Sequence, residues 1–187
     1  VDHNTWLEHK IVDLQEVIRS DFIAVDAITA GQHMMLTPTP FSLGAIVMGD
    51  NSCAVDTVCA HMIHVDPRQV HHLRMASERG YGPLDLADIR ILGDYPLEDV
   101  RERSRSFGVG PVRIDDDYAT EPNLRCTVGT FPEAHSRDYC WGGCPGSLQE
   151  AVHIHDEFTP RCLDAMQRIH YVVGRVQGPL DIDDDEW

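Results

Sequence analysis

Hydrophobic and polar residues repeat along this chain with two different periods, and each period predicts a different kind of element. Apolar residues spaced three or four apart predict an amphipathic helix over residues 4–20, where Leu7, Ile11, Leu14 and Ile18 fall on one stripe. Thr5 and Glu8 have the spacing of a capping box, which favours a helix start there. The chain therefore begins with a surface helix that has one apolar face.

Two short apolar runs follow and predict buried strands. Residues 22–28 and 43–48 are rich in the side chains that strands favour. The segment between them, residues 29–42, contains the sequence Thr37-Pro-Thr-Pro40, and its two prolines exclude a helix. We expect a long loop there, of the kind that often carries function.

Two helices and a third strand are predicted next. One helix covers residues 52–64, and a second starts at Asp66-Pro67, where a capping residue precedes a proline, and stops at Gly80. Residues 89–92 form the third strand. Because a strand, two helices and a strand follow one another, the pattern predicts a right-handed crossover in a parallel sheet.

The rest of the chain is richer in loops and cysteine. The pattern predicts a polar helix over residues 96–105, a short strand over 112–114 and a loop-rich segment over 115–146. It then predicts a helix from residue 147 onward, a second helix over 160–169 and a last strand over 171–176. The predicted fold is α/β, with a mixed or mostly parallel sheet and flanking helices, followed by a loop-rich cysteine-bearing segment. We expect an α/β core over residues 1–115 and a C-terminal segment, residues 116–187, packed on it.

Composition and charge exclude some classes of function. With 187 residues, 42% hydrophobic and 25% charged, the chain is long enough and apolar enough for a folded core. Fifteen basic against 31 acidic residues give a net charge of −16, which argues against nucleic acid and anionic membranes as partners. No apolar run approaches the ~20 residues of a membrane helix. The six cysteines are too sparse for a disulfide scaffold and suit reduced thiols in the cytoplasm. The start at Val1 indicates a piece of a longer protein.

Acidic residues at the predicted strand ends form the first candidate site. Asp50 and Asp94 each follow a glycine after a strand, and Asp56 lies in the first turns of the next helix. If the two strands are parallel neighbours, these carboxylates share an acidic rim that could bind a hard cation or act in acid–base catalysis. Asp26 is the weakest member, because the first two strands lack an intervening helix and suit an antiparallel pair. The alternative is ordinary turn and helix-dipole chemistry.

Four cysteines form the second candidate site. They are Cys126, Cys140, Cys144 and Cys162. Thiolates bind iron–sulphur clusters or zinc, and Cys144 precedes a predicted helix N-terminus that favours a thiolate. The alternatives are a local disulfide, free buried thiols, or a cluster completed by residues outside this chain. Cys53 and Cys59 are predicted to be structural, since a free cysteine packs as a small hydrophobe.

Histidine provides one further candidate. Of the eleven histidines, His33 lies in the predicted proline-containing loop and is the candidate acid–base group. His61 and His64 lie one helical turn apart, but they lack the His-Glu-x-x-His pattern of zinc proteases. The sequence has no phosphate loop, no Gly-x-Gly-x-x-Gly and no Gly-x-Ser-x-Gly motif, so nucleotide-dependent and serine-hydrolase functions find no support.

Five sequence blocks together resemble a known family. They are residues 21–28, 43–56, 65–70, 76–82 and 89–94. Their order and spacing resemble the domain of unknown function 362 family over about residues 9–94. The resemblance implies an α/β fold and an association with iron–sulphur proteins, and it carries over no catalytic residue. Gly31 to Pro40 replaces a Gly-rich segment usual in the family, and a full ferredoxin motif is absent.

We therefore predict an iron–sulphur-binding or other metal-binding redox or enzyme domain. Its four cysteines would hold the group, and a small-molecule substrate or a redox partner would meet it at the acidic rim. One alternative is a non-enzymatic interaction module with a structural zinc or no metal. Another is a hydrolase or isomerase that uses a hard cation at Asp50, Asp56 and Asp94. A homo-oligomer is compatible with each of these, and the sequence identifies no reaction.

Overall fold

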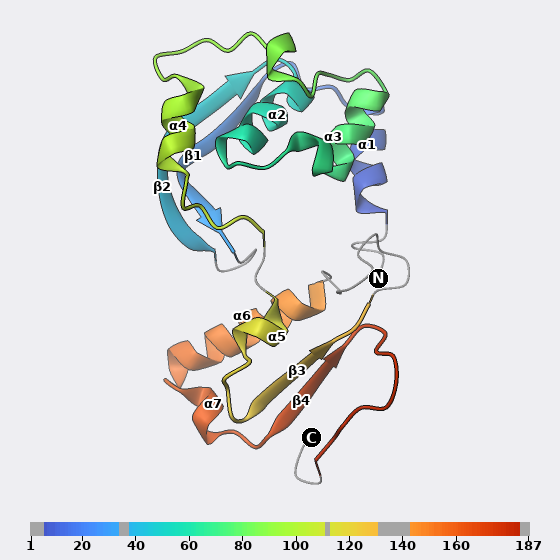
Figure 1. Ribbon diagram of the computed structural model, residues 1–187, viewed down its shortest axis with the longest axis vertical. Helices are drawn as coiled ribbons and strands as arrows, with labels where there is room; N and C mark the ends of the chain where they lie inside the picture. Colours follow the sequence, from blue (N-terminus) through green and yellow to red (C-terminus); the bar gives the residue numbers. More distant parts are fainter. Residues whose placement is uncertain (1–5, 34–37, 111–112, 131–142, 184–187) are drawn as a thin grey trace. The chain divides into compact units, whose positions relative to one another are not determined.

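A computed structural model describes residues 6–33, 38–110, 113–130 and 143–183 (Figure 1). These residues form two compact units, an N-terminal unit within residues 6–110 and a C-terminal unit within residues 113–183. The described residues contain seven α-helices and two sheets of two strands each. The predicted α/β class is confirmed. The single, mostly parallel sheet is not found in the described part of the chain, because its strands pair separately within each unit.

An antiparallel hairpin forms the sheet of the N-terminal unit. Strand β1 (Ile23–Gln32) pairs with β2 (Thr39–Gly49), and the register shifts between Ala27 and Thr29. Both strands extend into residues 29–42, so the predicted long loop is wrong for most of that segment. Prolines are tolerated because every strand of a two-stranded sheet is an edge strand, which can spare a donor on its outer side.

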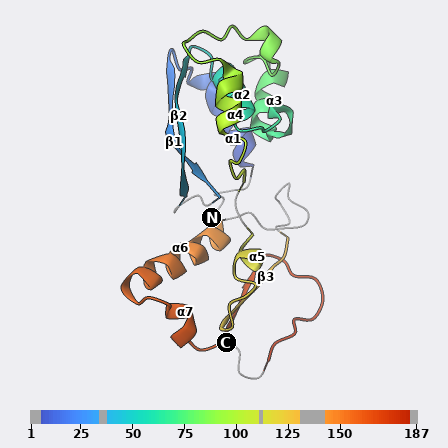
Figure 2. The same ribbon diagram turned by 60° about the vertical axis from the view of Figure 1, so that its left-hand side comes forward.

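Helices cover one face of this hairpin (Figure 2). Helix α2 (Ser52–Met62) starts where predicted, and the Asn51 side chain caps it by accepting a 2.9 Å hydrogen bond from the backbone N–H of Ala54. Helix α4 (Leu97–Arg103) lies where the polar helix was predicted, and it packs beside α2. The buried residues between the helices and the sheet are Ala27, Leu43, Val58, Met62 and Val100.

A second core lies where α1 (Leu7–Val17) meets α3 (His71–Glu78). Its buried residues are Val12, Cys53, Leu73 and Ala76. Helix α1 is shorter than predicted, and its one buried residue is Val12, while Leu14 of the predicted apolar stripe is 58% exposed. The stripe is wrong at Leu14 because α1 packs mainly on the short helix α3, and Val12 is the side chain buried there. A 2.6 Å ion pair between Asp13 and Arg79 also joins these helices.

The link after α2 departs from the prediction in two places. Asp66 does act as a cap, but only for a 3-10 turn, η1 (Pro67–Gln69), and extended backbone at Val70 separates this turn from α3. A second 3-10 turn, η2 (Leu86–Asp88), precedes the predicted strand 89–92, which is not a strand. A strand needs a paired neighbour, and no strand of this unit pairs with it. The predicted parallel crossover therefore does not form within residues 38–110.

The C-terminal unit is built on a parallel strand pair. Strand β3 (Leu124–Val128) pairs with β4 (Ile169–Val173), which starts two residues and ends three residues before the predicted last strand. Helix α5 (Ile114–Asp117) precedes β3, so the strand predicted at residues 112–114 is wrong at Ile114, a fully buried residue that starts a helix. The predicted loop-rich segment thus contains both α5 and β3.

Two helices connect β3 to β4. Helix α6 (Gly143–Phe158) starts before Ser147, so the predicted cap is an interior residue; Pro145 lies in the first turn, where proline is tolerated. The helix predicted over residues 160–169 is reduced to α7 (Cys162–Ala165), because Ile169 already belongs to β4. In the described residues, no helix has both the length and the apolar character needed to cross a membrane.

Candidate functional site

Asp56 is the most enclosed member of the predicted acidic set. Helix α2 places it partly buried, opposite His72 of α3. Burial raises the pKa of the Asp56 carboxyl, and the charge of His72 partly offsets this effect. Asp56 in turn adds to the effect of burial in raising the pKa of two thiols, Cys53 and Cys59. The carboxylate therefore belongs to a small titratable cluster on α2 and α3.

The other acidic candidates do not join this cluster through the predicted sheet. Asp50 follows β2 and is exposed, as predicted from its position after Gly49. Asp94 is exposed too, but it follows no strand, so the acidic rim does not form in the way predicted. Asp26 lies on β1 of an antiparallel pair, and its Oδ1 accepts a 2.9 Å hydrogen bond from the Ile28 backbone N–H. That contact is local backbone chemistry.

His33 lies at the end of β1 in a left-handed conformation, with φ of 67°. Its ring lies against Gly108, where an added Cβ would be 1.9 Å from the ring carbon Cε1. Next to it, the Gln32 side chain accepts a 2.8 Å hydrogen bond from the Gly108 backbone N–H. The histidine therefore helps to hold the segment after α4 on the hairpin, and only a glycine at position 108 leaves room for it.

The C-terminal unit brings two of the four candidate cysteines to one region. Cys126 is partly buried on β3, and burial, together with the charges of Asp115 and Asp117, raises the pKa of its thiol to about 11. Cys162, the first residue of α7, is 8% exposed, and its Sγ lies 3.9 Å from the backbone oxygen of Val152 in α6. Both are free thiols rather than halves of a disulfide.

Tyr118 lies near both of these cysteines. It follows α5 and is partly buried, and burial is the largest cause that raises the pKa of its phenol. Asp117, Cys126 and Cys162 add to this effect, in that order, so both thiols lie within electrostatic reach of one phenol. The sequence offers no pattern that singles out Tyr118, because a lone tyrosine after three aspartates has no recognisable spacing to either cysteine.

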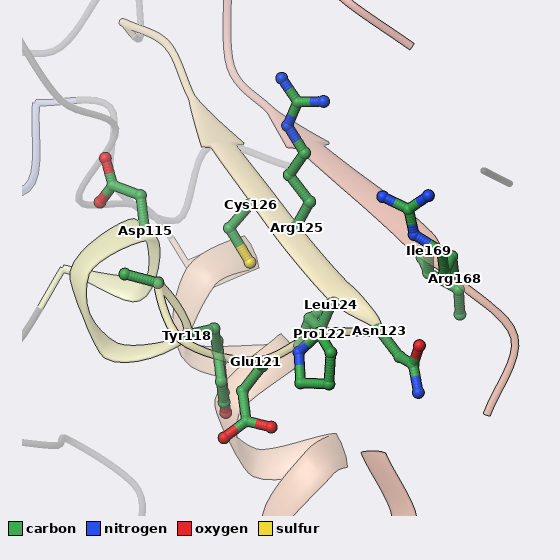
Figure 3. Close-up of a pocket in the computed structure, with 11 residues that line it drawn as sticks. Asp115, Tyr118, Glu121, Pro122, Asn123, Leu124, Arg125, Cys126, Arg168 and Ile169 are labelled. Atoms are coloured by element: carbon green, nitrogen blue, oxygen red, sulfur yellow. The ribbon is translucent and has the colours of Figure 1, made fainter. Parts of the chain in front are cut away.

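A polar cavity of about 320 Å³ lies beside Cys126. Figure 3 shows Asp115, Tyr118 and Cys126 on one side of β3, with Arg168 on the other. Arg168 pairs with Asp183 at 3.1 Å and Arg125, also in the lining, pairs with Asp181 at 4.0 Å. Both guanidinium groups thus have carboxylate partners from the same unit. Of the two carboxylates in the lining, Asp115 pairs with Arg113 at 2.8 Å, and Glu121 is the other. The cavity therefore offers the Cys126 thiol and carboxylates rather than a site for an anion.

The described residues contain no complete metal-ligand set. Among them, no group of three or more histidine, cysteine, aspartate or glutamate side chains could hold a metal ion. Cys140 lies outside the described residues, and Cys144 lies in α6 with its side chain outside the description. Of the four candidate cysteines, the structure therefore describes the side chains of Cys126 and Cys162, and both lie near Tyr118.

Comparisons with known proteins agree with the predicted resemblance for one part of the chain. No curated protein and no solved structure matches it. A family model does match, over α1, β1, β2 and all but the last residue of α2. The later blocks of the resemblance, residues 65–94, and all four candidate cysteines lie beyond that match, which carries no reaction or cofactor. Residues 1–61 are thus similar to the family described as Domain of unknown function (DUF362), as the sequence blocks predicted.

Proposed function

We propose that the C-terminal unit binds a metal ion or an iron–sulphur cluster through Cys126 and Cys162, as the metal-binding part of a redox or enzyme protein. The observation that carries this proposal is that both thiols lie within electrostatic reach of Tyr118. They come from β3 and α7, elements far apart in the sequence of the same unit. Two thiols from separate elements near one side chain would supply half of a four-thiolate site.

The charges around Cys126 suit a cation better than a reactive thiol. A thiol with a pKa of about 11 stays protonated near neutral pH, so Cys126 is a poor nucleophile. The negative charges of Asp115 and Asp117 that disfavour a thiolate favour a metal cation, which displaces the thiol proton on binding. The same two aspartates therefore oppose nucleophilic chemistry at Cys126 and support metal ligation.

Cys140 and Cys144 would complete the ligand set. Cys144 lies in the first turn of α6, the helix whose Val152 carbonyl lies next to Cys162. A cluster held by four cysteines would supply one-electron transfer, whereas zinc in the same set would supply cross-linking of α6, α7 and β3. The chain's own contribution is to gather the thiols, to hold Tyr118 beside them and to surround Cys126 with negative charge.

Metal analysis with an absorbance spectrum tests the proposal. The protein would be purified without oxygen and compared with the variants Cys126→Ser, Cys162→Ser and Cys59→Ser. Cys59 is the matched control, because its thiol is also partly buried with a pKa raised to about 11, but it lies on α2 in the other unit. We expect stoichiometric metal in the wild type and in Cys59→Ser, and its loss in the other two variants.

The spectrum separates the two forms of the proposal. Visible absorbance with iron and sulphide would identify a cluster and a redox role. A colourless protein with one zinc per chain would identify a structural site and a non-enzymatic module. If the wild type held no metal after incubation with iron and sulphide or with zinc, or if Cys59→Ser lost metal as fully as Cys126→Ser, the proposal would be wrong.

A further inference from the structure

The β1–β2 hairpin has a second face that its helices leave exposed. Figure 2 shows α2 and α4 on the same side of the hairpin. The opposite face carries the cross-strand pairs Ala24–Met48 and Asp26–Ile46. Met48 is 62% exposed and Ile46 is 56% exposed, and Ile28 farther along β1 is 51% exposed. Large apolar side chains thus line a face that is open to solvent.

This outer face, defined by Ala24, Asp26, Ile28, Ile46 and Met48, differs from scattered surface apolar residues. Its members belong to two adjacent strands: Ala24 pairs with Met48, Asp26 pairs with Ile46, and Ile28 lies at the register shift that follows, so they form one strip along the hairpin. Phe22, directly before β1 and 65% exposed, extends it at one end. Contiguous exposed apolar surface on a folded unit marks a binding surface, because each Å² removed from water contributes about 25 cal/mol.

The charges on this face define what can cover it. The sequence has no lysine or arginine between Arg19 and Arg68, so the hairpin carries no positive side chain. Asp26 lies inside the strip, opposite Ile46, while Asp21 and Asp50 flank its end, where Ile23 pairs with Gly49. The strip is therefore apolar with negative charges only.

These charges disfavour two of the possible occupants. A second copy of a chain with a net charge of −16 would bring like carboxylates together across the contact. An anionic lipid surface would be repelled by Asp21, Asp26 and Asp50 for the same reason. A segment with apolar side chains bordered by lysine or arginine would instead bury the strip and neutralise its carboxylates.

We propose that the outer face of the hairpin binds a cationic amphipathic helix of a partner protein. Helices already cover the opposite face of the same sheet, which leaves this apolar face accessible to a helix of another protein. The apolar stripe of the partner lies on Ile28, Ile46 and Met48, and its basic residues meet Asp26 and the acidic end of the strip. This surface is independent of the cysteine site in the other unit.

A peptide selection tests the partner's chemistry directly. A displayed library of random peptides of about 16 residues, long enough for several helical turns, would be selected on the full chain. The double variant Ile46→Thr and Met48→Thr would be kept out of the selection and used afterwards to measure binding. Threonine keeps the strand preference of the hairpin while removing the apolar surface. The matched control is Leu14→Thr with Val17→Thr, which changes two exposed apolar residues of α1.

We expect the selected peptides to carry lysine or arginine beside apolar residues spaced three and four apart. Measured by fluorescence anisotropy, their affinity should fall about tenfold or more in the hairpin double variant and stay unchanged in the α1 control. Asp26→Asn should weaken binding severalfold and reduce its salt dependence.

Three outcomes would overturn the proposal. One is a selection that yields only neutral or acidic peptides. Another is a set of selected peptides in which apolar residues recur at every second position, because this period indicates a strand added at the hairpin edge instead of a helix on its face. The third is light scattering that shows a wild-type dimer which the hairpin double variant converts to a monomer, because the occupant would then be a second copy.

Discussion

Thr57 offers the sharpest test of how the N-terminal unit is held together. It is fully buried on α2, and its Oγ1 donates a 3.0 Å hydrogen bond to the backbone oxygen of Pro83 in the link after α3. Thr57→Val replaces the hydroxyl by a methyl group of similar size, so packing is nearly conserved while the hydrogen bond is lost. Valine and threonine also have similar helix propensities, so α2 itself is little affected.

The expected loss of stability depends on which contacts the Pro83 backbone oxygen retains in Thr57→Val. Leaving a buried carbonyl without its donor costs about 1–3 kcal/mol. The Cys53 thiol also lies 3.7 Å from this oxygen and retains a weak contact, which places the cost in the lower half of that range, at about 1–2 kcal/mol. A free-energy change of that size makes the unfolded state about 5–30 times more populated.

Amide hydrogen exchange of α2 is the suitable assay, because it reports this unit separately from the other one. The slowest α2 amides exchange through unfolding of the unit, so they should exchange about 5–30 times faster in Thr57→Val. Thr57→Ser, which keeps the donor and loses one methyl group, should cost about 1 kcal/mol by lost apolar contact. If Thr57→Val exchanged at the wild-type rate, the hydrogen bond would contribute nothing and the reasoning would be refuted.

Three further substitutions test other contacts of the same unit. Ser104→Ala removes a fully buried hydroxyl that donates to the Met62 carbonyl at the end of α2, and it should destabilise the unit by about 1–3 kcal/mol in the same exchange assay. Gly82→Ala places a Cβ 2.4 Å from Asn51 Oδ1, so it should displace the cap of α2 and speed exchange of the first α2 amides. Asp56→Asn should stabilise the unit at neutral pH, measured by urea unfolding as a function of pH.

The sign of the Asp56 effect follows from linkage. Burial is the main cause that raises the folded-state pKa of this carboxyl above its ordinary value of 3.8, so the folded state binds the proton more tightly than the unfolded state. Stability should therefore fall as pH rises from 3.8 through the folded-state pKa, and the loss persists at neutral pH. Asparagine removes this titration, so its pH profile should be flatter in that window. A steeper profile would contradict the assignment.

Two matched variants control for the substitutions themselves. Ser106→Ala changes an exposed serine two residues after Ser104 and should leave exchange in α2 unchanged. Gly146→Ala places a Cβ in open space within α6, with no atom within 4 Å, and should stabilise that helix by about 0.5–1 kcal/mol. A similar loss of stability in Gly82→Ala and Gly146→Ala would show that steric contact with Asn51 is not the cause.

Local patterns predicted the elements whose cause is local. Helix α2 starts at its predicted residue because Asn51 caps it through its own side chain. The two strands of the hairpin were predicted too short, because Pro38 and Pro40 exclude a helix but not an edge strand. Residues 89–92 have the composition of a strand, yet a strand needs a neighbour, and pairing is not encoded in a four-residue run.

The candidate sites also differ in whether they depend on residues that are distant in the sequence. The acidic rim depended on parallel pairing of two distant strands, so it failed together with the strand at residues 89–92. Cys126 and Cys162 were selected by chemistry alone, and the fold brings both to Tyr118. The tyrosine was missed because its part in the site comes from the packing of α5 against β3, which no sequence spacing records.

A comparison of Cys59 with Cys126 shows why neighbours identify a ligand better than a pKa does. Both thiols have a pKa raised to about 11, first by burial and then by aspartate charge. Cys59 lies on α2 and packs against the core of its unit, so its protonated thiol acts as a small apolar side chain. Cys126 borders a polar cavity and shares a tyrosine with a second thiol. Of these two thiols, Cys126 is the one beside a cavity, so the proposal expects loss of metal in Cys126→Ser but not in Cys59→Ser. That result would locate metal binding outside residues 1–61.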